Sequence, residues 1–155
     1  MDEMDRMLLR LLLEDSAATA TELSRRVNLS VPAVNKRIAR LKKSGVIECF
    51  TVRLNAERVG KGVQAFVLVA VSRYAKSEEL LETVQADPDI LECHAVTGEY
   101  DYLLKVCARD VAELERKLLR LKEKECVAKS HTMFSLMTHK HISGPLPECI
   151  EEEQP

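Results

Sequence analysis

Positively charged side chains recur along one side of the segment from residue 31 to 44. Lys36, Arg40 and Lys43 are spaced to share one face of a helix, and Pro32 and Ala33 keep the beginning of that face small. Small residues allow close approach of the backbone, and the cations favour an anionic ligand. The face therefore fits the major groove of DNA, with its cations on phosphates. Taken alone, an ordinary solvated helix surface explains the same charges equally well.

The surrounding residues favour the DNA interpretation. Ser30 can cap a helix, Pro32 falls in its first turn, and Gly45 can adopt the left-handed conformation that ends it. Residues 19–22, Thr-Ala-Thr-Glu, form a capping-box pattern that predicts a shorter helix over 21–27. A short helix, a tight turn and a second helix with a basic outer face are typical of a helix-turn-helix.

The candidate DNA-binding residues divide by chemistry. The side chains expected on phosphates or at the groove edge are Lys36, Arg40 and Lys43. The residues expected at the groove-facing end of the helix are Ser30, Pro32, Ala33 and Asn35. Arg25 and Arg26, on the shorter helix, can reach the DNA backbone. Arg37 lies on the flank, where a structural ion pair with an acid such as Glu22 is the alternative to a DNA contact.

Composition limits the class of protein. No apolar run in the 155 residues is long enough to span a membrane, and the chain begins with the acidic Met-Asp-Glu-Met-Asp, so we expect neither an anchor nor a signal peptide. Five scattered cysteines form no Cys-x-x-Cys pair, which predicts reduced thiols, a cytoplasmic protein and no metal site. No nucleophile–base pairing indicates a catalytic centre.

Charge is divided unequally along the chain. The net charge is −2, yet residues 16–62 contain ten Lys/Arg against three Asp/Glu. Residues 63–155 contain eleven Lys/Arg against seventeen Asp/Glu. A basic first part and an acidic remainder predict a polyanion-binding module joined to a module with another role.

The periodicity predicts an α+β chain with two modules. The helices expected in the first part lie near 4–14, 21–27 and 31–44, and a strand is expected over 46–54. The strands expected in the second part cover 63–72, 90–97, 101–107 and 127 to about 139. Helices capped by Ser77 and Asp110 complete a ferredoxin-like β-α-β-β-α-β order. We expect a winged-helix-like helix-turn-helix domain with its connector strand over 1–61, a second domain over 62–142 and an acidic tail over 143–155.

The second sheet is expected to need a partner. Both faces of the strand over 63–72 are apolar, and both helices of a ferredoxin-like fold cover the same face of the sheet. The other face would leave an apolar patch in water, and a second copy of the chain is the simplest cover. A homodimer would also present two helix-turn-helix units to two DNA half-sites.

Both modules resemble the Lrp/AsnC, or feast/famine, family of transcription regulators of bacteria and archaea. The motifs that carry the resemblance in the first module are residues 5–9, 22–27, 29–30, 37–38 and 41–47. In the second module it is carried by Gly98-Glu99-Tyr100-Asp101, where the family usually has Asp or Asn in place of Glu99. The resemblance implies a module for regulation of amino-acid metabolism (RAM), an amino-acid effector and no cofactor.

The hairpin motif has two interpretations. From the residues alone, Gly98 to Asp101 is an ordinary turn, although Gly98 allows backbone N–H groups to bind a carboxylate and Asp101 can pair with an ammonium. Tyr100 would then form a wall of the pocket. The resemblance favours the binding interpretation and implies that the effector binds at the interface between dimers. It adds residues 133–135 (Met-Phe-Ser) to the site. It also implies that dimers assemble to octamers.

Two other functions stay open at this point. Relatives with both modules decarboxylate tetrapyrroles, as in sirohaem chemistry, through histidines and arginines, and this chain has four histidines. Their basic helix is often weakened, whereas the helix over 31–44 is strongly cationic. An architectural protein that wraps DNA without an effector is the third alternative.

Overall fold

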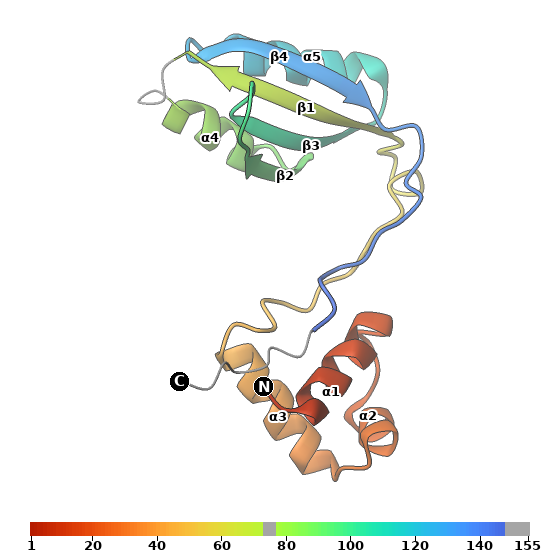
Figure 1. Cartoon of the computed structure of the whole chain (residues 1–155). Coiled ribbons are helices and arrows are strands. Elements are labelled where there is room, and N and C mark those ends of the chain that lie inside the picture. Colours follow the sequence, from red (N-terminus) through yellow and green to blue (C-terminus); the bar gives the residue numbers. More distant parts are fainter. Residues whose placement is uncertain (73–76, 148–155) are drawn as a thin grey trace, which may run out of the picture. The chain divides into compact units, whose positions relative to one another are not determined.

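The computed structural model describes residues 1–72 and 77–147. These form two compact units: Met1–Arg53 with residues 140–147, and Leu54–His139 (Figure 1). Most of the acidic tail expected over 143–155 lies outside the described residues. None of the helices in the described ranges is long and apolar enough to cross a membrane.

The described residues of the first unit form three helices whose beginnings are set by side-chain caps. They are α1 (Glu3–Glu14), α2 (Ala20–Val27) and α3 (Val31–Lys43). The predicted capping box between Thr19 and Glu22 is confirmed, as is the Ser30 cap of α3. Asn28 ends α2 with a left-handed φ of 52° and turns the chain towards α3. Leu8, Leu23 and Val34, one from each helix, are buried at the centre of this unit.

The strand expected over 46–54 is wrong, because the chain there forms turns and irregular structure. A run of β-branched residues becomes a strand only when another strand satisfies its backbone groups, and no neighbouring strand of the described chain pairs with it. The segment consequently exposes apolar side chains, with Val52 79% and Leu54 66% exposed. The Lys42 ammonium lies over the Phe50 ring, 5.6 Å from its centroid.

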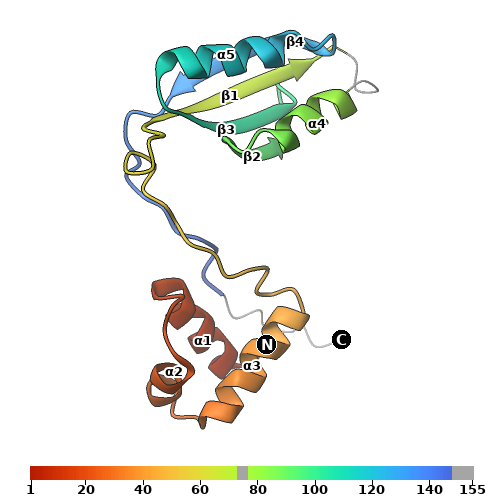
Figure 2. The same cartoon turned by 180° about the vertical axis from the view of Figure 1, so that it is seen from behind.

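The second unit has the predicted ferredoxin-like order. Its elements are β1 (Val63–Val71), α4 (Ser77–Ala86), β2 (Ile90–Ala95), β3 (Tyr102–Ala108), α5 (Val111–Lys122) and β4 (Val127–Phe134). The strands form one antiparallel sheet in the order β2-β3-β1-β4. Both helices lie on the same face of this sheet (Figures 1 and 2).

The alternation of side chains along β1 divides its residues between two environments. Ala65, Val67 and Val69 are buried beneath the helices, and Val67 pairs with the equally buried Leu104 of β3. The last strand is shorter than expected, because β4 pairs only with β1 in the part of the chain that the structure describes. The Ser135 N–H still donates to the Gln64 carbonyl at 2.9 Å, but β1 begins at Val63 and offers no further partner.

The opposite face of the sheet, here called the open face, has no helix over it (Figures 1 and 2). Phe66 and Leu68 of β1 lie on it and are only partly buried. Phe66 is paired with Lys105 of β3 and with the 42%-exposed Met133 of β4. Leu68 is likewise flanked by Leu103 and His131. The apolar second face expected from the sequence is therefore present.

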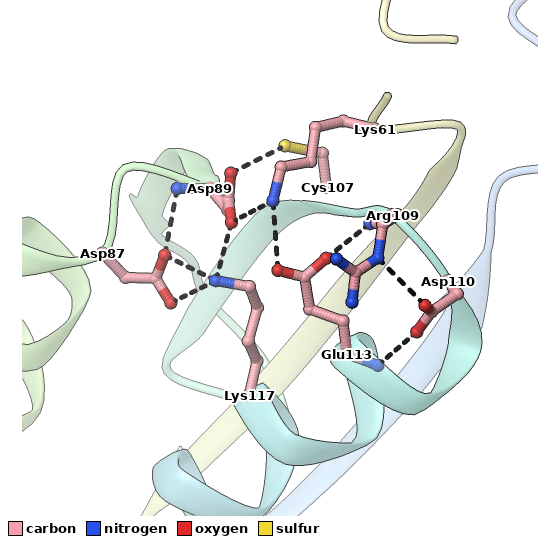
Figure 3. Close-up of polar contacts among 8 residues, drawn as sticks. All are labelled: Lys61, Asp87, Asp89, Cys107, Arg109, Asp110, Glu113 and Lys117. Atoms are coloured by element: carbon pink, nitrogen blue, oxygen red, sulfur yellow. Dashed lines mark hydrogen bonds and ion pairs between the residues drawn. The ribbon is translucent and has the colours of Figure 1, made fainter. Parts of the chain in front are cut away.

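A network of ion pairs ties together segments at one end of this unit (Figure 3). The Lys61 ammonium, just before β1, lies 2.8 Å from an Asp89 oxygen and 3.1 Å from a Glu113 oxygen. The Lys117 ammonium of α5 contacts Asp87 at 2.7 Å and Asp89 at 2.9 Å. The hydrogen bond from Lys61 is the main cause that lowers the pKa of Asp89 from its ordinary value of 3.8. The network therefore fixes α5 to the loop before β2.

We expect Lys117→Met to destabilise this unit by about 2 kcal/mol at pH 7, because the Asp87 carboxylate loses its cation in a partly buried site. After Lys61, the hydrogen bond from Lys117 also lowers the pKa of Asp89. The stability that comes from the Lys117–Asp89 pair is therefore present above the ordinary pKa of Asp89 and is lost as pH falls through the lower folded-state pKa. The difference between variant and wild type should therefore shrink below about pH 4. Urea denaturation followed by circular dichroism at several pH values measures it.

Lys124→Met is the matched control, because Lys124 pairs with Glu79, whose side chain is 60% exposed. It should leave the denaturation midpoint nearly unchanged. Equal effects of the two substitutions would show that burial of the network contributes nothing.

Candidate nucleic-acid interface and ligand-binding hairpin

Helix α3 presents one apolar and one polar side. Val34 and Leu41 are buried at 0% and 3% exposure, which fixes the opposite side towards solvent. The exposed candidate DNA-binding residues on α3 and at its cap are Ser30, Pro32, Asn35, Lys36, Arg40 and Lys43. Ala33 is half-buried, and its N–H donates to the Ser30 hydroxyl at 3.4 Å. The small beginning and cationic remainder predicted for this face thus lie on one accessible surface.

The cations of this surface differ in how free they are. Lys36 and Lys43 have no acidic side chain of the described chain within ion-pair distance. The Arg40 guanidinium lies 2.5 Å from Asp5, although the Arg40 side chain is 60% exposed. Lys36 and Lys43 are therefore the cations most available to a polyanion.

Arg37 forms a structural ion pair, but with other acids than the one suggested by the sequence. Its guanidinium lies 2.8 Å from Asp5 and 2.5 Å from Asp2, whereas the Glu22 carboxylate accepts the Thr19 backbone N–H at 2.7 Å. The hydrogen bond with Arg37 lowers the pKa of Asp2, and the same pair raises the pKa of the guanidinium. Arg37 is thus largely occupied within the unit.

Sequence reasoning did not identify Asp5 as a partner of α3. Asp5 is only 1% exposed, among the apolar residues of α1 that build the core. It precedes the buried Leu8 and Leu12 by three and seven residues, so it occupies a core-facing position of the helix. A carboxylate at such a position is the signal that would have predicted a cationic partner elsewhere in the chain.

The two arginines of α2 have different neighbours. Arg26 pairs with Glu14 of α1 at 3.2 Å, with both side chains more than half exposed. Arg25 is exposed and lies near Glu22, whose pKa is lowered chiefly by the Thr19 backbone hydrogen bond and slightly by Arg25. Both stay accessible on the short helix of the pair.

The hairpin between β2 and β3 contains the predicted turn residues. Gly98 has a φ of 121°, a conformation that residues with a side chain rarely adopt. Asp101 is fastened to β1, because its N–H donates to the Val69 carbonyl at 2.9 Å and its Oδ2 accepts the Val71 N–H at 2.7 Å. The Asp101 carboxylate therefore supports the hairpin in addition to any ligand that it binds.

A cation that sequence reasoning missed lies against this hairpin. The Lys129 ammonium of β4 lies over the Tyr100 ring, 4.8 Å from its centroid, and forms an ion pair with Glu99. The Glu99 carboxylate raises the pKa of Lys129, and Lys129 lowers that of Glu99. Only the pairing of β4 with β1 brings residues so distant in sequence together, so no local pattern indicated the contact.

Residues 133–135, the other part of the expected ligand site, lie elsewhere on the sheet. Met133 and Phe134 pair with Phe66 and Ala65 near the beginning of β1, whereas Asp101 bonds to Val69 and Val71 near its end. At about 3.4 Å per residue, this separation amounts to about 15 Å along the strand. One chain therefore does not bring the two parts of the expected site together.

In the ranges 1–72 and 77–147, no group of three or more His, Cys, Asp or Glu side chains is placed to hold a metal ion. The His94 imidazole lies 3.3 Å from Glu92, and both side chains are exposed.

Comparison with known proteins covers both units. The model of the Lrp/AsnC ligand binding domain matches residues 64–144, and the model of a winged helix-turn-helix DNA-binding domain matches residues 1–48. The chain is 33% identical over 143 residues to the HTH-type transcriptional regulator FL11 of Pyrococcus horikoshii, covering 92% of this chain and 94% of that protein.

Two solved structures extend the likeness to three dimensions. A transcriptional regulator from Neisseria meningitidis, solved as an L-Met complex, has a TM-score of 0.88 and 31% identity, covering 92% of this chain and 94% of that one. The feast or famine regulatory protein of Mycobacterium tuberculosis complexed with L-methionine has a TM-score of 0.86 and 31% identity, covering 94% and 99%. All three relatives are named as regulators.

Proposed function

Because this chain belongs to the Lrp/AsnC family of ligand-responsive, DNA-binding transcriptional regulators, we propose that the outer face of α3 contacts operator DNA and that an amino acid bound at the β2–β3 hairpin controls this contact. The DNA assignment depends on one observation above all. Lys36 and Lys43 are exposed, unpaired within the described chain and on the side of α3 opposite its buried residues. The residues proposed to lie against the DNA bases, at the beginning of this face, are Ser30, Pro32, Ala33 and Asn35.

We expect Lys36→Gln to weaken DNA binding through one lost phosphate contact. The plot of log affinity against log salt should become shallower by about one for any duplex. Electrophoretic mobility shifts at several salt concentrations measure this slope. Lys122→Gln, which neutralises a lysine at the end of α5, is the matched control and should leave the slope unchanged. An unchanged slope for Lys36→Gln would remove this lysine from the interface.

The effector is proposed to be an amino acid, and its site is proposed to use two copies of the chain. Two relatives of known structure were solved with L-Met, which supports this class of ligand. Asp101 supplies a carboxylate for the ammonium, and Tyr100 supplies a wall. Since residues 133–135 lie about 15 Å along the sheet from Asp101 in one chain, a site containing both takes them from different copies.

Two substitutions of Asp101 separate ligand binding from stability. Asp101→Asn keeps a carbonyl oxygen for the Val71 N–H, so we expect the fold to stay intact while the thermal shift caused by the effector disappears. Asp101→Ala leaves that N–H without its acceptor and should lower stability by about 1–3 kcal/mol as well.

Differential scanning fluorimetry of the wild type against the twenty amino acids first identifies the ligand. Retention of the full shift by Asp101→Asn would exclude an ionic role for Asp101. DNA binding without any thermal shift in the whole screen would favour the architectural alternative.

A homodimer formed through the open face is also proposed. Phe66, Leu68 and Leu103 form the apolar middle of this face, and a second copy of the same sheet would cover them. A two-fold dimer would then carry two copies of α3 to two DNA half-sites. We propose further assembly to octamers, and a cytoplasmic location in keeping with the DNA partner.

We expect Leu68→Glu to convert the dimer to a monomer, because a carboxylate in the apolar middle of the interface would lose its hydration on burial. Size-exclusion chromatography with light scattering gives the mass of each species, including assemblies beyond the dimer. Ala112→Glu adds the same charge to exposed α5 and should leave the mass unchanged. A monomeric wild type at micromolar concentration would contradict the proposal.

A further inference from the structure

The buried carboxylate of Asp5 bonds to the helix proposed to contact DNA. Asp5 is the one charged residue that is buried in the described part of the chain, with 1% exposure. Its two oxygens bind different arginines of α3, Oδ1 with Arg37 at 2.8 Å and Oδ2 with Arg40 at 2.5 Å. The Asp2 N–H also donates to Oδ2 at 3.2 Å. Both cationic partners of this carboxylate therefore come from α3.

The two arginines are held to different degrees. Arg37 bonds to both Asp5 and Asp2, and its side chain is 25% exposed. Among the described residues, Arg40 bonds only to Asp5, and its side chain is 60% exposed, so much of its guanidinium still faces water. A guanidinium has five N–H donors, and carboxylates and phosphates compete for them. Asp2 and Asp5 thus occupy donors that DNA phosphates would otherwise attract.

We propose that Asp5 is a positioning residue for DNA recognition, which withholds Arg37 from phosphates and holds Arg40 at the edge of the α3 surface. This inference rests on the proposed DNA contact of α3. Arginines released from Asp5 are long and mobile, and they would meet phosphates of any sequence equally well. Asp5 therefore limits the number of sequence-independent contacts, so that discrimination between DNA sites depends on the base-facing residues of α3.

A purely structural role for Asp5 makes a different prediction. An ion pair that only docked α1 against α3 would affect the folded fraction and leave the number of phosphate contacts unchanged. The salt dependence of binding counts those contacts, whereas the folded fraction changes the affinity for every duplex by the same factor. The slope against salt therefore distinguishes the two roles.

The experiment uses the full chain with two duplexes of equal length, one selected by the wild type from a randomised library and one of random sequence. For Asp5→Asn, which is nearly isosteric, we expect the slope on the random duplex to become steeper by about one, because Arg40 loses the carboxylate to which it bonds and gains a phosphate, whereas Arg37 keeps Asp2. The ratio of affinities for the selected and random duplexes should fall about fivefold or more. Circular dichroism melts establish the folded fraction.

A second substitution tests the cause. Asp5→Asn with Arg40→Gln should bring the slope back towards the wild-type value, since the released cation is absent. Asp2→Asn removes only the half-exposed partner of Arg37 and should change the slope little. A wild-type slope and an unchanged affinity ratio for Asp5→Asn would overturn the inference.

If Asp5→Asn does not fold, Arg37→Gln tests the same inference. Because Arg37 is withheld from phosphates in the wild type, Arg37→Gln should leave the slope unchanged while Lys36→Gln lowers it. An equal decrease for both would show that Arg37 contacts DNA and would refute the role of Asp5. If the wild type itself bound no duplex in a salt-dependent way, the proposed DNA contact of α3 would fail instead.

Discussion

The second unit depends on burial of the inner face of β1. This strand pairs with β3 on one side and with β4 on the other, and its alternate residues Ala65, Val67 and Val69 form the floor on which both helices pack. Because β1 is equally apolar on its other side, one layer of helices satisfies only half of its surface. The need for a second layer follows from the composition of this one strand, and the proposed dimer is its direct consequence.

Local features of the fold were predictable from the sequence. Caps at Thr19 and Ser30 give the beginnings of α2 and α3, and the order of the second module follows from alternating strand and helix patterns. The absence of a strand over 46–54 and the end of β4 could not be predicted, because a strand exists only where a partner strand satisfies its backbone groups. Local residue patterns do not show whether that partner strand is present.

The candidate sites show the same division. The exposed face of α3 and the turn at Gly98 follow from spacing and residue type. The ion pairs that adjust these sites join residues far apart in sequence: Arg37 is 32 positions from Asp5, and Lys129 is 30 positions from Glu99. Tertiary packing creates these contacts. Sequence reasoning could name the charged residues but not decide which of them are already neutralised.

The separation of Asp101 from residues 133–135 has a thermodynamic consequence for the proposed regulator. If a bound amino acid must touch both, its binding is linked to association of the chains, and each equilibrium shifts the other by the same factor. The half-saturating concentration of the amino acid would then vary with the amount of protein present. Such a regulator would respond to its own concentration as well as to that of the amino acid. Dilution of the protein alone would weaken its response.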